Sequence, residues 1–396
     1  MTVSNGQKNT EALTYLGYDP GFSANKFACV RSGEMVTYLL PSSVGEANRR
    51  LQNGLALPGV VRAAQRSARQ PFRVVFEGIE YLVGPNVSDY TEPIDRLDFN
   101  RFKDSPELRA TFYAGVSRII NGGAHRAAIA LALPVKVLAQ EGEAEQVEKA
   151  IKGWLVGRHL FSVDGVECAL EVVNVRARVP QPVATWFDWG MDLSGQWVRG
   201  KQSQLAPTLV IDQGFNTLDV LLVSGGRISQ RFTEGDTLGM RRAAERLIRS
   251  IKHKYGPELE LHQASDLVQQ IVNGQKAEIY VEGQLTDITV ETRQALKALE
   301  SEVFNYLDRT IKSKESYHIL LTGGGALALR EMLLRQFPKA TVMAEPVLAN
   351  ARGLAKLAVR PGFFPSSVTG RLPFSVERKI ELIFARPKSN ESLRLF

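Results

Sequence analysis

The sequence predicts an α/β protein with two domains of related topology. Its 396 residues are enough for two domains, strands and helices alternate along both halves, and each half begins with three short strands. The chain is 44% apolar and 23% charged, which is typical of globular proteins and excludes an intrinsically disordered chain. We therefore expect each half to form its own sheet and core.

The first half is expected to begin with strands that are rich in β-branched and aromatic residues, at 13–19, 25–30 and 35–40. A hairpin follows with its turn at Glu77-Gly78. Ser105 and Pro106 are typical of a helix start and predict a helix over 104–121. The remaining elements predicted for this half are a buried strand at 127–135 and a helix at 141–156.

The second half repeats this order, with predicted strands at 209–212, 218–223 and 227–232. Its later elements are helices at 237–254, 286–313, 326–336 and 347–358, strands at 317–321 and 340–343, and a mixed segment at 257–285. Between the halves, 177–206 and the following Pro207 together hold three prolines and three tryptophans, so we expect an ordered crossover.

Two glycine turns follow the first strand of each half, Asp19-Pro-Gly21-Phe22 and Asp212-Gln-Gly214-Phe215. Glycine lets the backbone approach a ligand, and N–H groups and small polar side chains can donate to phosphate oxygens. An aspartate repels phosphate, so it would act through Mg²⁺ that keeps some of its waters. Asp-x-Gly is also a common turn, but its recurrence at matching places favours phosphate binding.

A third motif joins the strand at 317–321 to three glycines, Gly323, Gly324 and Gly325, and then to a helix. Bare backbone here would let an adenine or ribose lie close, and the helix N-terminus favours negative charge. Close strand–helix packing would also explain such glycines. The motif is not a Walker A loop, because no Gly-Lys-Ser/Thr follows.

With these motifs placed, the chain resembles the actin-like ATPase superfamily, and within it the ParM/StbA-type proteins of bacteria and archaea. DPGFSANK at 19–26 is similar to the first phosphate loop of that family, and VIDQGFNTLDVLLV at 210–223 to the second. LTGGGA at 321–326 is similar to its adenosine motif, and ANARGLAKLA at 349–358 to its closing helix. The second loop departs from the family pattern at Phe215, where many relatives have glycine.

The resemblance implies a duplicated, ribonuclease H-like, two-domain actin-like fold with a nucleotide cleft between the domains. Domain I would span 1–178, with a small subdomain at about 42–103 and the helix 347–358 returning to it. Domain II would span 179–346, with a small subdomain at about 257–285, and 359–396 would be a basic C-terminal extension. That extension has seven basic and three acidic residues, so it supplies +4 of the net charge of +7.

The resemblance also implies the site residues for ATP or ADP with Mg²⁺. Asp19 and Asp212 would organise the metal shell through water, in the family's manner, and Gln181 would orient the attacking water. The phosphates would contact Gly21, Ser23, Asn25, Lys26, Gly214, Asn216 and Thr217. The adenosine would lie against Gly323, Gly324 and Gly325, with Arg242 and Glu245 near the ribose or base. Gln181 could instead be an exposed turn residue between two prolines.

The function that the resemblance implies is an ATPase that polymerises into cytoplasmic filaments and segregates plasmid or other DNA through a DNA-bound adaptor. Two alternatives stay open: a sugar or small-acid kinase of the same superfamily, and a non-polymerising, nucleotide-dependent regulator. Cys29 and Cys168 cannot form a disulfide framework, which indicates a reducing cytoplasm. No apolar run of about 18 residues could span a membrane. Direct nucleic-acid binding is left open by the basic tail.

Overall fold

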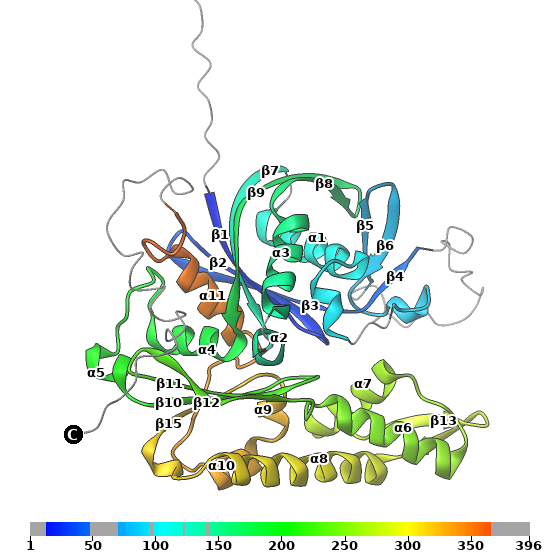
Figure 1. Ribbon diagram of the computed structural model, residues 1–396. Helices are drawn as coiled ribbons and strands as arrows, with labels where there is room; N and C mark the ends of the chain where they lie inside the picture. Colours follow the sequence, from blue (N-terminus) through cyan, green and yellow to red (C-terminus); the bar gives the residue numbers. More distant parts are fainter. Residues whose placement is uncertain (1–12, 48–69, 95–97, 122, 140–141, 366–396) are drawn as a thin grey trace, which may run out of the picture.

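The structure is a computed structural model that describes residues 13–47, 70–94, 98–121, 123–139 and 142–365, without the side chains of 230–235. Two sheets lie one above the other, with helices between them and on their outer faces (Figure 1). The α/β architecture with one main sheet for each half of the chain, which the sequence predicts, is confirmed. The predicted C-terminal extension lies outside the described residues from 366 onward.

The first sheet has nine strands in the order β3-β2-β1-β7-β9-β8-β5-β6-β4. Its strands are β1 (Leu13–Pro20), β2 (Ala24–Arg31), β3 (Glu34–Pro41), β4 (Val44–Glu46), β5 (Phe72–Phe76), β6 (Ile79–Val83), β7 (Gly123–Leu133), β8 (Gly157–Val163) and β9 (Val166–Pro180). β1 pairs parallel to β7, and β7 pairs parallel to β9.

The second sheet has five strands in the order β12-β11-β10-β15-β16. These are β10 (Thr208–Gln213), β11 (Leu218–Ser224), β12 (Arg227–Asp236), β15 (His318–Thr322) and β16 (Thr341–Val342). β10 pairs parallel to β15, and β15 parallel to β16. The order and directions match those of β3-β2-β1-β7-β9, so the structure contains the predicted repeat of a five-stranded unit.

Helices cover both faces of each sheet. Those outside the first sheet include α1 (Pro106–Ile120) and α3 (Glu143–Leu155), whereas α2 (Val135–Ala139) contacts β12 of the second sheet. Those beside the second sheet are α6 (Arg241–Tyr255), α7 (Leu261–Val272), α8 (Thr289–Thr310), α9 (Gly325–Ala328) and α10 (Arg330–Gln336). Between the sheets lie α4 (Gln181–Gly190) and α11 (Ala349–Val359), and α5 (Gly200–Leu205) follows α4 (Figure 1). A Cβ at Gly353 would lie 1.7 Å from the Ala184 carbonyl oxygen, so α11 and α4 cross in backbone contact.

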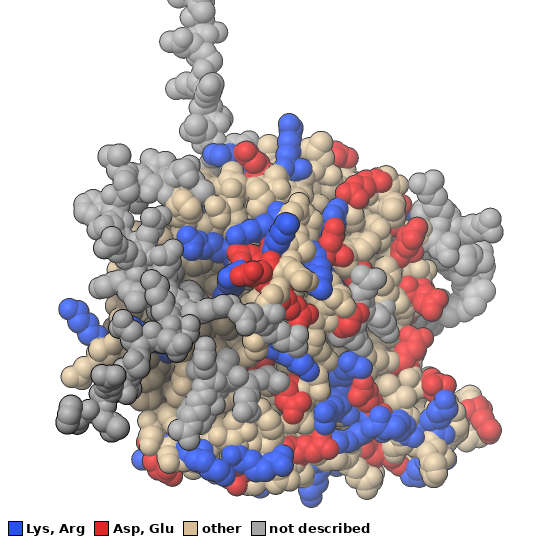
Figure 2. All heavy atoms as spheres, viewed as in Figure 1, with Lys and Arg blue, Asp and Glu red and all other residues tan. Residues whose placement is uncertain are grey.

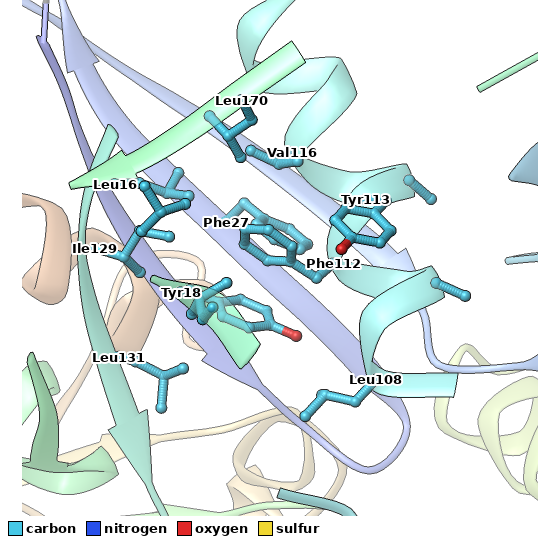
Figure 3. Close-up of a cluster of buried hydrophobic side chains, with 14 of the residues drawn as sticks. Leu16, Tyr18, Phe27, Leu108, Phe112, Tyr113, Val116, Ile129, Leu131 and Leu170 are labelled. Atoms are coloured by element: carbon cyan, nitrogen blue, oxygen red, sulfur yellow. The ribbon is translucent and has the colours of Figure 1, made fainter. Parts of the chain in front are cut away.

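An aromatic core forms between the first sheet and α1 (Figure 3). Tyr18 and Phe27 are fully buried, and their stacked ring centroids lie 4.7 Å apart. Gly115 on α1 allows this packing, because a Cβ there would lie 2.0 Å from the Phe27 ring. A separate core fills the space between the second sheet and α6, α7 and α8. Each sheet thus has its own core.

Most predicted elements are confirmed, and the differences come from tertiary packing. The predicted helix over 237–254 begins only at Arg241, because the preceding residues extend β12 and then turn at Gly239. The hairpin β8–β9 was not predicted, although its strands alternate in burial and Asp164-Gly165 forms its turn with positive φ at both residues. A small hairpin, β13 (Glu278–Val281) and β14 (Gln284–Asp287), lies in the segment expected to be mixed. The residue limits of the two domains stay a prediction.

Within the described ranges, no helix is both long and apolar enough to cross a bilayer. Cys29 and Cys168 are both free and buried.

Candidate functional site

A cavity of about 250 Å³ lies between the two sheets, at the ends of their central strands. Most of the residues predicted for the site line it: Asp19, Gly21, Ser23, Lys26, Gln181, Asp212, Gly214, Asn216, Thr217, Gly323, Gly324 and Gly325. The structure therefore brings together three motifs that are up to 300 residues apart in the sequence. Asn25, Arg242 and Glu245 are not part of its lining.

The first glycine turn is closed by a backbone hydrogen bond of 3.1 Å from the Gly21 N–H to the Ala24 carbonyl oxygen. A Cβ at Gly21 would lie 2.5 Å from that oxygen, so the turn requires glycine. Asn25 is fully buried behind the turn, where its Oδ1 accepts a 2.7 Å hydrogen bond from the Tyr18 hydroxyl and its Nδ2 donates to Ser42 Oγ. Asn25 thus holds the turn in place and does not face the cavity.

The second glycine turn has the same backbone geometry as the first. The Gly214 N–H donates to the Thr217 carbonyl oxygen over 2.8 Å, and Asp212 lies opposite Asp219 in the strand pair as Asp19 lies opposite Lys26. The two turns therefore differ in charge at matching positions, with a lysine in one and a buried aspartate in the other. Phe215, which departs from the family pattern, lines the cavity.

Both carboxylate oxygens of Asp19 have a polar partner. Its Oδ1 accepts a 2.7 Å hydrogen bond from Gln181 Nε2, and its Oδ2 lies 3.2 Å from Lys26 Nζ. Gln181 follows β9 directly as the first residue of α4, and only 8% of it is exposed. The interpretation of Gln181 as an exposed turn residue is therefore wrong.

Asp212 is held by a polar network that the motifs did not predict. Asn350 Nδ2 on α11 donates to Asp212 Oδ2 over 2.8 Å, and Thr185 Oγ1 on α4 donates to Asn350 Oδ1 over 2.7 Å. Burial raises the pKa of Asp212 from its ordinary value of 3.8 to about 6; the Asn350 hydrogen bond opposes this and the nearby Asp19 charge adds to it. Asn350 lies within the ANARGLAKLA segment, but nothing in the sequence pattern distinguishes it from a packing residue.

Asp219 is a second buried carboxyl beside the cavity. Burial raises its pKa from 3.8 to about 8, and the Asp212 charge adds to this, while the hydrogen bond that Thr217 Oγ1 donates over 2.9 Å lowers it. Asp219 does not line the cavity itself. Its protonated form is therefore favoured at neutral pH.

The three glycines of the third motif have different roles. Gly323 has a φ of +85°, and a Cβ there would lie 2.3 Å from the Gln213 carbonyl oxygen. A Cβ at Gly325 would lie 2.4 Å from Gln213 Cγ, whereas the nearest atom to one at Gly324 is 3.7 Å away. Close packing against β10 therefore explains two of the glycines, and Gly324 leaves open space at the cavity.

Asp19 and Asp212 are two residues in the cavity that could hold a divalent cation. In the part of the chain that the structure describes, no group of three or more His, Cys, Asp or Glu side chains is arranged to hold a metal ion. Mg²⁺ keeps several waters and needs only one or two carboxylates when phosphates supply further oxygens. Asp19 and Asp212, buried at the cavity wall, fit an ion of this kind.

Two residues predicted to contact the nucleotide lie elsewhere. Arg242 and Glu245 line a different hollow on the outer side of α6, where Arg242 pairs with Glu302. In their place, α7 provides polar side chains to the cavity, among them Asp266 and Gln269. No sequence signal identified α7, because its cavity-facing residues are common on any solvated helix.

Two family models match the chain. The model of the N-terminal domain of actin-like proteins matches residues 17–183, and the model of the C-terminal domain of archaeal MreB-like actin homologues matches residues 210–335. Together these matches span most of the chain and contain all three glycine motifs. The chain belongs to the actin-like protein family. Residues 184–209, which hold most of α4 and all of α5, lie between the two matches. A comparison with curated proteins found no match.

Solved structures share the fold of this actin-like chain. A ParM from Clostridium botulinum, solved as a 15-stranded filament, is 18% identical with a TM-score of 0.65, covering 87% of this chain and 99% of its own. An archaeal actin homologue is 15% identical with a TM-score of 0.65 and the same coverage. Bacillus thuringiensis ParM with AMPPNP is 13% identical with a TM-score of 0.57, covering 87% and 97%. At these identities the likeness establishes the fold alone.

Proposed function

We propose that this chain binds ATP with Mg²⁺ in the cavity between the sheets and hydrolyses it. The observation that carries the proposal is the pair of matched glycine turns, each with a buried aspartate, that face one cavity from two sheets. Two such turns can donate backbone N–H groups to the same polyphosphate from opposite sides. ATP binding in this cavity would therefore join the two halves of the molecule.

Each polar residue at the cavity has a distinct role in this proposal. Lys26 neutralises phosphate charge, and Ser23, Asn216 and Thr217 donate to phosphate oxygens. Gln181 holds and orients the attacking water, since an amide both donates and accepts without acting as a strong base. Asp19 and Asp212 would hold Mg²⁺, which would supply charge neutralisation on the phosphates.

We further propose that the chain polymerises into cytoplasmic filaments that segregate plasmid or other DNA through an adaptor protein. Its support is the family membership and the likeness to a ParM that forms a filament. A nucleotide that bridges the two sheets would favour one relative arrangement of them, and hence one arrangement of the surfaces that meet in a filament.

The test measures phosphate release and sedimentation of the purified protein with ATP and Mg²⁺, with ADP, and with ATP and EDTA. We expect phosphate release and pelletable assemblies only with ATP and Mg²⁺. Asp212→Asn should abolish both, because it removes a carboxylate at the metal shell. Asp89→Asn, at an exposed position on the same chain, should leave both unchanged.

Two results would contradict the proposal. A protein that stays monomeric at high concentration with ATP and Mg²⁺ rules out the filament. Phosphate transfer that depends on an added sugar or small acid, without release of phosphate in its absence, assigns the chain to the kinases of the superfamily.

A further inference from the structure

A second hollow lies on the outer side of α6, apart from the cavity between the sheets. Its volume is about 400 Å³, and it is lined by Thr237, Glu245 and four arginines: Arg241, Arg242, Arg246 and Arg249. Figure 2 shows Lys and Arg side chains gathered over α6 on this face of the molecule. We call this hollow, defined by those four arginines, the arginine pocket.

The arginines lie on one side of the helix because of their spacing. Positions 241, 242, 246 and 249 fall within less than half a turn of an α-helix viewed along its axis, and they span about 12 Å of its length. The guanidinium groups therefore converge on one hollow instead of spreading around the helix.

Nearby carboxylates only partly neutralise this charge. Glu245 lies 2.7 Å from Arg241, and Glu302 on α8 pairs with both Arg242 and Arg246. Arg249 has no ion-pair partner among the residues that the structure describes. Four positive charges thus meet two negative charges in a hollow where like charges repel.

The N-terminus of α6 adds to the repulsion among the four arginines as long as no anion is bound. Arg241 and Arg242 are the first two residues of α6, whose first turn holds no acidic residue. Positive side chains there oppose the helix dipole, which favours negative charge at this end. The backbone N–H groups of Arg241 and Arg242 already donate to Phe215 and Gly239 carbonyl oxygens, so the guanidinium groups would hold an anion.

We propose that the arginine pocket binds a phosphate-bearing anion, at a site separate from the nucleotide cavity. The planar guanidinium group donates two parallel hydrogen bonds that match a phosphate, and all four cations here are arginine. A span of about 12 Å accommodates two or three linked phosphates. These phosphates come either from a free polyphosphate or from a nucleic-acid backbone.

The pocket also contacts the nucleotide cavity at one point. Arg241 Nη1 donates to Asn216 Oδ1 over 3.2 Å, and Asn216 belongs to the second glycine turn. Arg241 is therefore left in place in the test, so that the variants change the pocket alone.

The experiment titrates the full chain with two probes, inorganic tripolyphosphate by calorimetry and a fluorescein-labelled 12-nucleotide single-stranded DNA by fluorescence anisotropy. Each charge-assisted contact is worth about tenfold in affinity, so Arg246→Gln/Arg249→Gln should weaken binding about 100-fold and Arg249→Gln alone about tenfold. Arg249→Gln breaks no ion pair among the described residues, so its effect cannot come from a disturbed fold. Lys201→Gln/Lys276→Gln removes the same charge from exposed positions and should bind as the wild type does.

Lys26→Ala changes the nucleotide cavity alone, so it distinguishes binding in the arginine pocket from binding in that cavity. Binding of either probe that is lost with the arginine variants and kept in Lys26→Ala supports the proposal, and the probe that binds identifies the source of the phosphate. Loss in Lys26→Ala alone, equal loss in the lysine control, or no binding of either probe overturns it. Binding of poly-glutamate without binding of either phosphate probe also overturns it. Failure of ATP hydrolysis would leave this result unaffected.

Discussion

Gln181 Nε2 donates a 2.7 Å hydrogen bond to Asp19 Oδ1, and the two residues are 162 positions apart. The contact joins the strand that begins the first sheet to the helix that leads out of it. It places an amide and a carboxylate at the same wall of the cavity, next to Lys26. A water that bridges these groups would be oriented by two fixed partners.

Gln181→Ala is expected to lower kcat for ATP hydrolysis about 100-fold, because it removes the side chain that orients the water. KM should change by only a few fold, since Gln181 is not expected to hold phosphate. Steady-state phosphate release measures both constants. Gln202→Ala, at an exposed position on α5, serves as the matched control. An unchanged kcat in Gln181→Ala would exclude this role.

Asp219→Asn is expected to stabilise the protein at alkaline pH and to have little effect at pH 4. Burial raises the folded-state pKa of Asp219 from 3.8 to about 8, so the folded chain holds the proton over this range while the unfolded chain releases it. The stability that this group contributes to the wild type is therefore lost as pH rises from about 4 to 8, by at most about 6 kcal/mol. Asparagine stays neutral and can still accept from Thr217.

Urea unfolding of the wild type and Asp219→Asn between pH 4 and pH 9 measures this difference. Asp89→Asn is the control, because the side chain of Asp89 is exposed. A difference between wild type and Asp219→Asn that stays constant over the whole pH range would contradict the raised pKa.

Gly323→Ala is expected to destabilise the fold by roughly 2 to 4 kcal/mol. Alanine there would need a φ of +85° and a Cβ 2.3 Å from the Gln213 carbonyl oxygen. Gly324→Ala is the matched control, because Gly324 has a helical φ of −64° and open space for a Cβ. Its unfolding free energy should stay within about 1 kcal/mol of the wild type. Equal unfolding midpoints in denaturant for the two variants would refute this distinction.

Asp188→Ala is expected to destabilise the contact between α4 and α11. Asp188 is 8% exposed and accepts a 2.7 Å hydrogen bond from Arg352 Nη2, while Lys356 Nζ lies 2.8 Å from its other oxygen. Removing the carboxylate leaves two half-buried cations side by side, at a cost of roughly 2 to 4 kcal/mol.

The comparison for Asp188→Ala is Glu171→Ala, which breaks an exposed ion pair with Arg126 and should cost less than about 1 kcal/mol. Thermal unfolding of both variants at equal salt measures the difference. If the two substitutions cost the same, the buried cluster does not stabilise the helix pair.

Local sequence signals predicted the helix caps and turns whose backbone conformation depends only on neighbouring residues. The Ser105 cap accepts a hydrogen bond from the Leu108 N–H as expected, and the turn at Glu77-Gly78 has positive φ at both residues. The two Asp-x-Gly-Phe turns predicted one phosphate site, and a Cβ would lie 2.5 Å from a carbonyl oxygen at Gly21 and 3.1 Å from one at Gly214. The hairpin β8–β9 carries the same kind of signal at Asp164-Gly165, which was overlooked, and only its place in the sheet depends on the neighbouring strands β5 and β7.

By itself, the sequence determined the α/β class, the repeat of the two glycine turns and the residues that form them, because turns, caps and strand alternation depend on neighbouring residues. Only the tertiary structure decided which side chains meet in the cavity. In the folded chain, Asn350 donates a hydrogen bond to Asp212, and Asn25 supports a turn and does not line the cavity. Arg242 and Glu245 line a separate pocket. These placements depend on how distant segments pack together, and side-chain contacts between such segments leave no periodic pattern in the chain.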